Sequence, residues 1–137
     1  MDDPHLPDGA RPEYEVSPHF AAAQHAGERP YLILDCRLPS EAEAATIVGS
    51  VLIPLHELEQ SLDDVEDALE DRGLPKDAPF AVLCHHGQRS LRAALLLQHA
   101  GFTGARSVFG GIELWASEVD TTIPRYVRDG SRCTIVE

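Results

Sequence analysis

The sequence predicts an α/β protein with a central parallel sheet of about five strands and helices on both faces. Three observations predict this fold. Short apolar runs alternate with helical patterns, the connections between them are short, and 137 residues suit a single domain. A chain of this length can bury a full core without disulfide or metal support. Ligand sites in such sheets lie at the carboxyl ends of the strands.

The first half of the chain supplies three strands and most of the helices. Residues 15–16 form a short strand, and Ser17 is a good N-cap for a helix that ends by residue 27. Residues 31–34 are a buried parallel strand, residues 39–45 a short helix, and residues 50–53 the next strand. Residues 55–71 form an amphipathic helical region that is broken near Ser61. Its acidic face is interpreted as solvated, with a docking surface for a basic partner as the alternative.

The second half repeats the alternation. Strands are expected at residues 80–83 and 106–109, and helices at residues 90–100 and 112–119. Glycines stand at the expected stops between them. We therefore expect a domain over residues 13–126, a flexible Pro- and Asp-rich tail over residues 1–12, and a polar tail over residues 127–137.

Composition excludes several classes of protein. Eleven basic against 23 acidic residues give a net charge of −12, which disfavours nucleic acid and anionic membranes as partners. No apolar run approaches the roughly 20 residues of a membrane helix, and the acidic N-terminus does not resemble a secretory signal. Three cysteines without C-x-x-C spacing disfavour a disulfide scaffold or a zinc ribbon. A cytoplasmic location follows as the expectation.

The segment from Cys84 to Ser90 carries the strongest chemical signal. It joins a buried strand to a helix N-terminus, where a loop can turn several backbone N–H groups inward and bind an anion. Gly87 permits a left-handed turn, and Arg89 adds a cation. A thiol in such a loop is expected to be a nucleophilic thiolate. The alternative is that Cys84 is a small buried core residue.

The remaining polar candidates have weaker signals. His85 and His86 suit a general base or a metal ligand, but no further metal-type spacing surrounds them, and no metal site is expected. Cys36 is interpreted as core packing, with a second redox thiol as the alternative. Cys133 is expected to be exposed, and Trp115 is expected to pack in the core.

Three blocks of the sequence resemble the single-domain rhodaneses, a family of sulfurtransferases. The blocks are residues 35–55, which begin Asp-Cys-Arg, the Cys84–Ser90 loop, and Gly110-Gly111-Ile-Glu-Leu-Trp. The first block departs from the family pattern, because residues 45–50 read Ala-Thr-Ile-Val-Gly-Ser where Gly-His-Ile-Pro-Gly-Ala is usual. The loop has four residues between Cys and Arg, one fewer than in the related phosphatases, so phosphatase or arsenate reductase activity is disfavoured.

The resemblance implies sulfur transfer through a persulfide on Cys84. It implies that the backbone amides of His85, His86, Gly87, Gln88, Arg89 and Ser90 bind the persulfide and that Arg89 holds an anionic donor such as thiosulfate. No metal or organic cofactor is implied, and the acceptor would be a thiophilic small molecule, a thiol or a sulfur-carrier protein. Asp35 and Arg37 could line this site, but we prefer a structural ion pair. The competing function is a non-enzymatic module that binds a partner or senses redox state.

Overall fold

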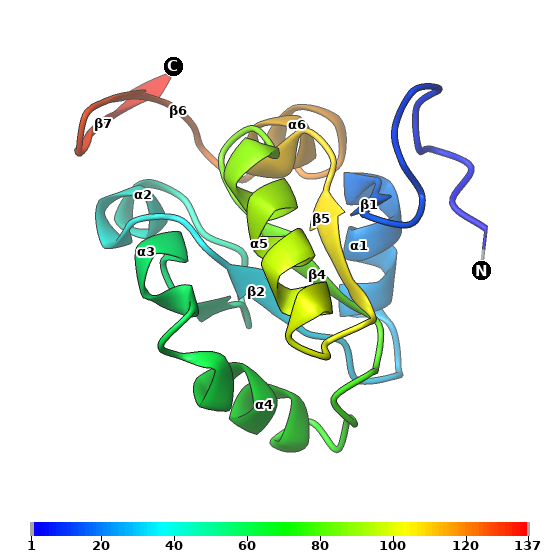
Figure 1. Cartoon of the computed structure of the whole chain (residues 1–137). Helices are drawn as coiled ribbons and strands as arrows, with labels where there is room; N and C mark the ends of the chain where they lie inside the picture. Colours follow the sequence, from blue (N-terminus) through cyan, green and yellow to red (C-terminus); the bar gives the residue numbers. More distant parts are fainter. Residues whose placement is uncertain (1, 137) are drawn as a thin grey trace.

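A computed structural model describes residues 2–136 and contains a five-stranded parallel sheet with helices on both faces (Figure 1). The sheet order is β1-β5-β4-β2-β3, and every neighbouring pair is parallel. The predicted fold class is therefore confirmed. The strands are β1 Glu15–Val16, β2 Ile33–Asp35, β3 Val51–Leu52, β4 Phe80–Leu83 and β5 Ala105–Val108.

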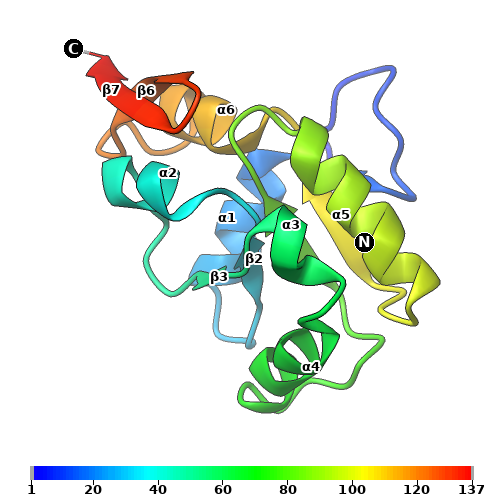
Figure 2. The same cartoon turned by 60° about the vertical axis from the view of Figure 1, so that its left-hand side comes forward.

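Two apolar cores lie on opposite faces of this sheet. One is formed with α3, α4 and α5, and the other with α1 and α6 (Figures 1 and 2). Side chains of β2 alternate between them, because Leu34 packs in the first core and Ile33 in the second. The helices are α1 Pro18–Ala26, α2 Pro39–Ala44, α3 Leu55–Leu58, α4 Leu62–Glu70, α5 Gln88–His99 and α6 Gly111–Glu118.

Local sequence signals account for several helix boundaries. The Ser17 side chain accepts a hydrogen bond from the Phe20 amide at 3.0 Å, so the predicted N-cap of α1 is confirmed. The break near Ser61 is also confirmed, since it separates α3 from α4. Helix α5 begins at Gln88, two residues earlier than predicted, because Gly87 adopts a left-handed φ of +100° and turns the chain directly into the helix.

The end of the chain forms an antiparallel hairpin that the sequence analysis did not predict. Its strands are β6 Arg125–Asp129 and β7 Arg132–Val136, joined by a turn in which Gly130 has a φ of +62°. The hairpin lies beside α2 and α6 (Figure 2). A tail was expected over residues 127–137, of which Glu137 is outside the described residues. Most hairpin side chains are exposed, so the segment lacks the apolar alternation of a half-buried strand.

The N-terminal segment has neither helix nor strand over residues 2–14. It contacts the domain through Asp3, whose carboxylate accepts hydrogen bonds from the Ser17 amide and hydroxyl, both at 2.6 Å. The tail expected over residues 1–12 includes Met1, which lies outside the described residues. Within residues 2–136, none of the helices has the length and apolar character required to cross a membrane.

Candidate active site

Cys84 directly follows β4, the central strand of the sheet, and three residues separate it from the start of α5. Its Sγ accepts a hydrogen bond from the Gly87 amide at 3.0 Å and lies 3.2 Å from Ser90 Oγ. Only 1% of the residue is exposed, although it contributes to the wall of a cavity. The structure therefore brings together the cysteine, the glycine turn and the helix N-terminus that the sequence placed in one loop.

The Gly110-Gly111 pair holds this loop in place. The first amides of α6 donate to the loop carbonyls, from Ile112 to Cys84 at 2.9 Å and from Glu113 to His85 at 3.1 Å. Gly111 has a φ of +63°, and a Cβ there would overlap the same two carbonyl groups. The third sequence block thus has a physical role, because only a residue without a side chain allows α6 to approach the loop so closely.

A chain of two buried hydroxyls leads from the thiol into the protein. Ser90 Oγ lies 2.7 Å from Ser107 Oγ, and Ser107 Oγ donates to the Gly87 carbonyl at 3.3 Å. In each of the Cys84–Ser90 and Ser90–Ser107 contacts either atom can be the donor, so the two hydroxyls can point toward Sγ or away from it. Toward a negatively charged Sγ, Ser90 would donate to the sulfur and Ser107 would donate to Ser90. Ser107 was missed because it lies on β5, 23 residues after Cys84.

Arg89 does not project freely into the cavity. Its two terminal nitrogens donate to the Glu41 carboxylate at 2.6 and 2.8 Å, and the Glu41 side chain is 0% exposed. Burial alone would raise the pKa of Glu41, but hydrogen bonds from Arg89 and Tyr126 outweigh it and lower the pKa from 4.5 to about 2. Glu41 is therefore ionised near neutral pH. It binds Arg89, the residue that was expected from the sequence to hold the anionic sulfur donor.

Tyr126 and Arg128 of the hairpin contact the same carboxylate. The Tyr126 hydroxyl donates to Glu41 at 2.7 Å, and Arg128 Nη1 donates to it at 3.1 Å. The Tyr126 ring stacks on His85 at a centroid distance of 4.0 Å, and His85 Nε2 donates to the Tyr126 carbonyl at 3.0 Å. Burial lowers the pKa of His85, so this imidazole is neutral and fixes the hairpin on the loop.

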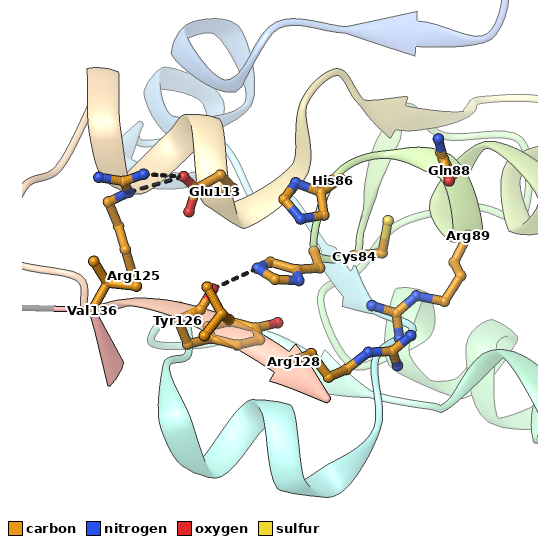
Figure 3. A pocket seen from close by; sticks show the side chains of 11 residues that line it. Cys84, His86, Gln88, Arg89, Glu113, Arg125, Tyr126, Arg128 and Val136 are labelled. Atoms are coloured by element: carbon orange, nitrogen blue, oxygen red, sulfur yellow. Dashed lines mark hydrogen bonds and ion pairs between the residues drawn. The ribbon is translucent and has the colours of Figure 1, made fainter. Parts of the chain in front are cut away.

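The other loop side chains lie at the rim of the cavity. His86 and Gln88 are exposed, and the His86 ring lies 3.9 Å from that of His85. The cavity has a volume of about 510 Å³ and is bounded by the loop, α6 and the hairpin (Figure 3). Its lining residues are Cys84, His85, His86, Gln88, Arg89, Glu113, Arg125, Tyr126, Val127, Arg128 and Val136. Within the described chain, residues 2–136 contain no group of three or more His, Cys, Asp or Glu suited to a metal ion.

Asp35 and Arg37 lie behind the site rather than in the cavity wall. Both are buried, and Arg37 donates to the two Asp35 oxygens from Nε at 2.9 Å and from Nη2 at 2.7 Å. Arg37 also donates to the carbonyls of Glu41 and Ala45. Burial would lower the pKa of Arg37, but Asp35 outweighs it and raises the pKa. The preferred structural ion pair is thus present, and it positions the segment that carries Glu41.

The other cysteines and Trp115 have packing positions. Cys36 is 1% exposed in the first core, and burial raises the pKa of its thiol, which is therefore protonated. Trp115 is 3% exposed in the second core, so the expected packing role is confirmed. Cys133, expected to be exposed, is partly buried against the second core because it lies on β7 of the hairpin.

Sequence comparisons match much of this chain to known proteins. Residues 19–118 match the Rhodanese-like domain family. The maize protein "Adenylyltransferase and sulfurtransferase MOCS3-1" is 38% identical over 97 residues, which cover 71% of this chain and 20% of that protein. The chain thus spans about a fifth of the length of that relative. "Thiosulfate sulfurtransferase GlpE" of Pseudomonas fluorescens is 33% identical over 109 residues, which cover 80% of this chain and 88% of that protein.

Solved structures agree with these matches. The human single-domain sulfurtransferase TSTD1 is 28% identical with a TM-score of 0.58, and the alignment covers 80% of this chain and 98% of that one. Reduced CoADR-RHD of Bacillus anthracis is 30% identical with a TM-score of 0.63, covering 80% of this chain and 18% of that one. From the match over residues 19–118 and the shared fold, we conclude that the chain belongs to the rhodanese-like domain family.

Proposed function

We propose that this protein is a sulfurtransferase that moves a sulfane sulfur from thiosulfate or a persulfide donor to a thiophilic acceptor through a persulfide on Cys84. The observation that carries the proposal is the position of Cys84 Sγ, which contacts the Gly87 amide at 3.0 Å and the Ser90 hydroxyl at 3.2 Å beside an open cavity. The family membership supports sulfurtransferase chemistry, since one relative is a thiosulfate sulfurtransferase.

The loading step is a displacement at sulfur. The Cys84 thiolate attacks the sulfane sulfur of thiosulfate, a new S–S bond forms at Sγ, and the old S–S bond breaks. Sulfite leaves with the electron pair of that bond, so no external oxidant or reductant is consumed. The Gly87 amide and the Ser90 hydroxyl stabilise the negative sulfur at Sγ. The persulfide lies at the N-terminus of α5, whose first amides have no partner inside the helix.

The unloading step converts the Cys84 persulfide back to the thiolate. A nucleophile such as cyanide or a thiolate attacks the outer sulfur of the persulfide, and the Cys84 thiolate leaves with the electron pair. The cavity, with a volume of about 510 Å³, has room for a small acceptor or for the end of a sulfur-carrier chain. We propose that the sulfur donor is a small anion and that the acceptor is a thiol or a sulfur-carrier protein. We also propose that the protein acts in the cytoplasm and needs no cofactor.

A variant pair tests this function. Cys84→Ser is expected to abolish thiocyanate formation from thiosulfate and cyanide, because serine cannot carry the sulfur. Cys133→Ser removes a partly buried thiol of the hairpin that is not part of the cavity wall, so it is expected to retain activity. Circular dichroism and thermal unfolding of both variants show whether the fold is intact. Full activity in Cys84→Ser would refute the mechanism, whereas inactivity of the wild type with every donor would favour the non-enzymatic alternative.

A further inference from the structure

The hairpin β6–β7 lies outside the region that matches the family and contributes to the wall of the candidate active site. The family match ends at residue 118, whereas the hairpin spans residues 125–136. Arg125, Tyr126, Val127, Arg128 and Val136 nevertheless form part of the cavity wall that contains Cys84 (Figure 3). Side chains from outside the matched region thus line the cavity that contains Cys84, and they are candidates for determining which donor binds.

Tyr126 fixes the position of this hairpin. It is the buried residue of β6, with 2% of its surface exposed, and its ring, carbonyl and hydroxyl all bind to the domain. The ring and carbonyl contact His85, and the hydroxyl donates to Glu41 and accepts from Arg37 at 3.2 Å. Arg128 lies two residues later on the same strand, so its guanidinium is directed to a defined place beside the loop.

Among the described residues 2–136, the charges around the site leave one arginine without a carboxylate of its own. Arg37 pairs with Asp35, Arg125 pairs with Glu113 at 2.6 Å, and both Arg89 and Arg128 pair with Glu41. Within the part of the chain that the structure describes, these four arginines share three carboxylates, a local surplus of one positive charge in a chain whose net charge is −12. Arg89 and Arg128 share a single oxygen of Glu41, at 2.6 and 3.1 Å. Two adjacent guanidinium groups with one carboxylate favour the binding of an anion between them.

Arg128 is better able than Arg89 to bind that anion. Arg89 donates two hydrogen bonds to Glu41 in a bidentate pair, and its side chain is 23% exposed. For Arg128, the interactions of the described residues include one hydrogen bond, and its side chain is 35% exposed. A guanidinium has five N–H donors, so Arg128 retains several for a ligand in the cavity that it lines.

We propose that Arg128 binds the oxyanion end of an anionic sulfur donor such as thiosulfate, so that the hairpin makes the site selective for anionic donors. This inference rests on the proposed function, because it concerns the same Cys84 loading step. Glu41 acts as a positioning residue that holds the two guanidinium groups together. The sulfane sulfur then meets Cys84 Sγ while the sulfonate group contacts Arg128, and sulfite leaves from that side.

The test compares two donors in single-turnover loading of Cys84, followed by intact-protein mass. Thiosulfate carries two negative charges, whereas cysteamine persulfide is a zwitterion because its ammonium group balances its ionised sulfur. Arg128→Gln is expected to lower the second-order rate constant for thiosulfate about tenfold, the loss of roughly one charge-assisted hydrogen bond. The variant should require more thiosulfate for half-saturation and should respond less to added salt. Loading from cysteamine persulfide should be unchanged.

Matched variants separate this role from a structural one. Arg132→Gln removes the same charge from the exposed strand β7, and Arg132 does not line the cavity, so thiosulfate loading should remain at the wild-type rate. Arg128→Lys should restore part of the lost rate, since it retains the charge. An unchanged thiosulfate rate in Arg128→Gln, or an equal loss of loading rate with both donors, would overturn the role of Arg128 but not the sulfurtransferase proposal. Failure of the wild type to load from either donor would instead overturn the sulfurtransferase proposal as well.

Discussion

Glu41 is the residue whose replacement most directly probes the electrostatic design of the site. Its carboxylate is 0% exposed and accepts hydrogen bonds from Arg89, Tyr126 and Arg128. Its pKa is lowered from 4.5 to about 2, and at 1.36 kcal/mol per unit the ionised form stabilises the fold by about 3 kcal/mol. Glu41→Gln should therefore lower the free energy of unfolding at pH 7 by about 3 kcal/mol, as expected for removing one partner of a buried ion pair.

The pH dependence gives the same prediction a second test. Because the pKa of Glu41 is lower in the folded state, its stabilisation is complete above about pH 4.5 and is lost as the pH falls through about 2. Urea unfolding of wild type and Glu41→Gln should thus show a difference in stability at pH 7 that narrows between pH 4.5 and 2. Glu43→Gln, an exposed change on the same helix, is the control and should leave stability nearly unchanged. A Glu41→Gln protein as stable as wild type at pH 7 would refute the reasoning.

Two further substitutions test the loop itself. Gly111→Ala places a Cβ against the carbonyls of Cys84 and His85 at a left-handed φ, and should cost about 1–3 kcal/mol of stability in urea unfolding. It should also slow sulfur transfer, because the loop must move. Ser90→Ala removes a hydroxyl 3.2 Å from Cys84 Sγ and should slow single-turnover loading by thiosulfate about tenfold. Exposed Ser117→Ala is its control, and equal loading rates in the two serine variants would contradict the role of Ser90.

The sequence predicted those parts of the site that lie close together along the chain. Cys84 and Arg89 were recognisable because a buried strand, a glycine and a helix start follow one another within seven residues. Glu41 was not recognised as the partner of Arg89, because 48 residues separate them and a charged residue in a short helix looks like any solvated position. Its burial depends on how α2 packs near the loop and the hairpin, which local patterns do not specify.

The hairpin was not predicted for a different reason. Tyr126 alone is buried in β6, so no alternation of apolar and polar residues marks the strand, and Arg128 appears as one more charge in a polar tail. The Gly130-Ser131 pair, which forms the two-residue loop between the paired residues Asp129 and Arg132, is a recognised hairpin signal and could have indicated the turn. Even with that signal, the contacts of Tyr126 with His85 and Glu41 are tertiary and required the structure.

The most direct test of the central claim is the intact mass of the protein after incubation with thiosulfate, measured for wild type and Cys84→Ser. A persulfide on Cys84 predicts a gain equal to one sulfur atom on wild type alone, and its removal by cyanide with formation of thiocyanate. The Gly87 and Ser90 contacts to Sγ predict that this species persists long enough to be observed. An equal gain on Cys84→Ser, or no gain on wild type with either thiosulfate or a persulfide donor, would contradict sulfur transfer through Cys84.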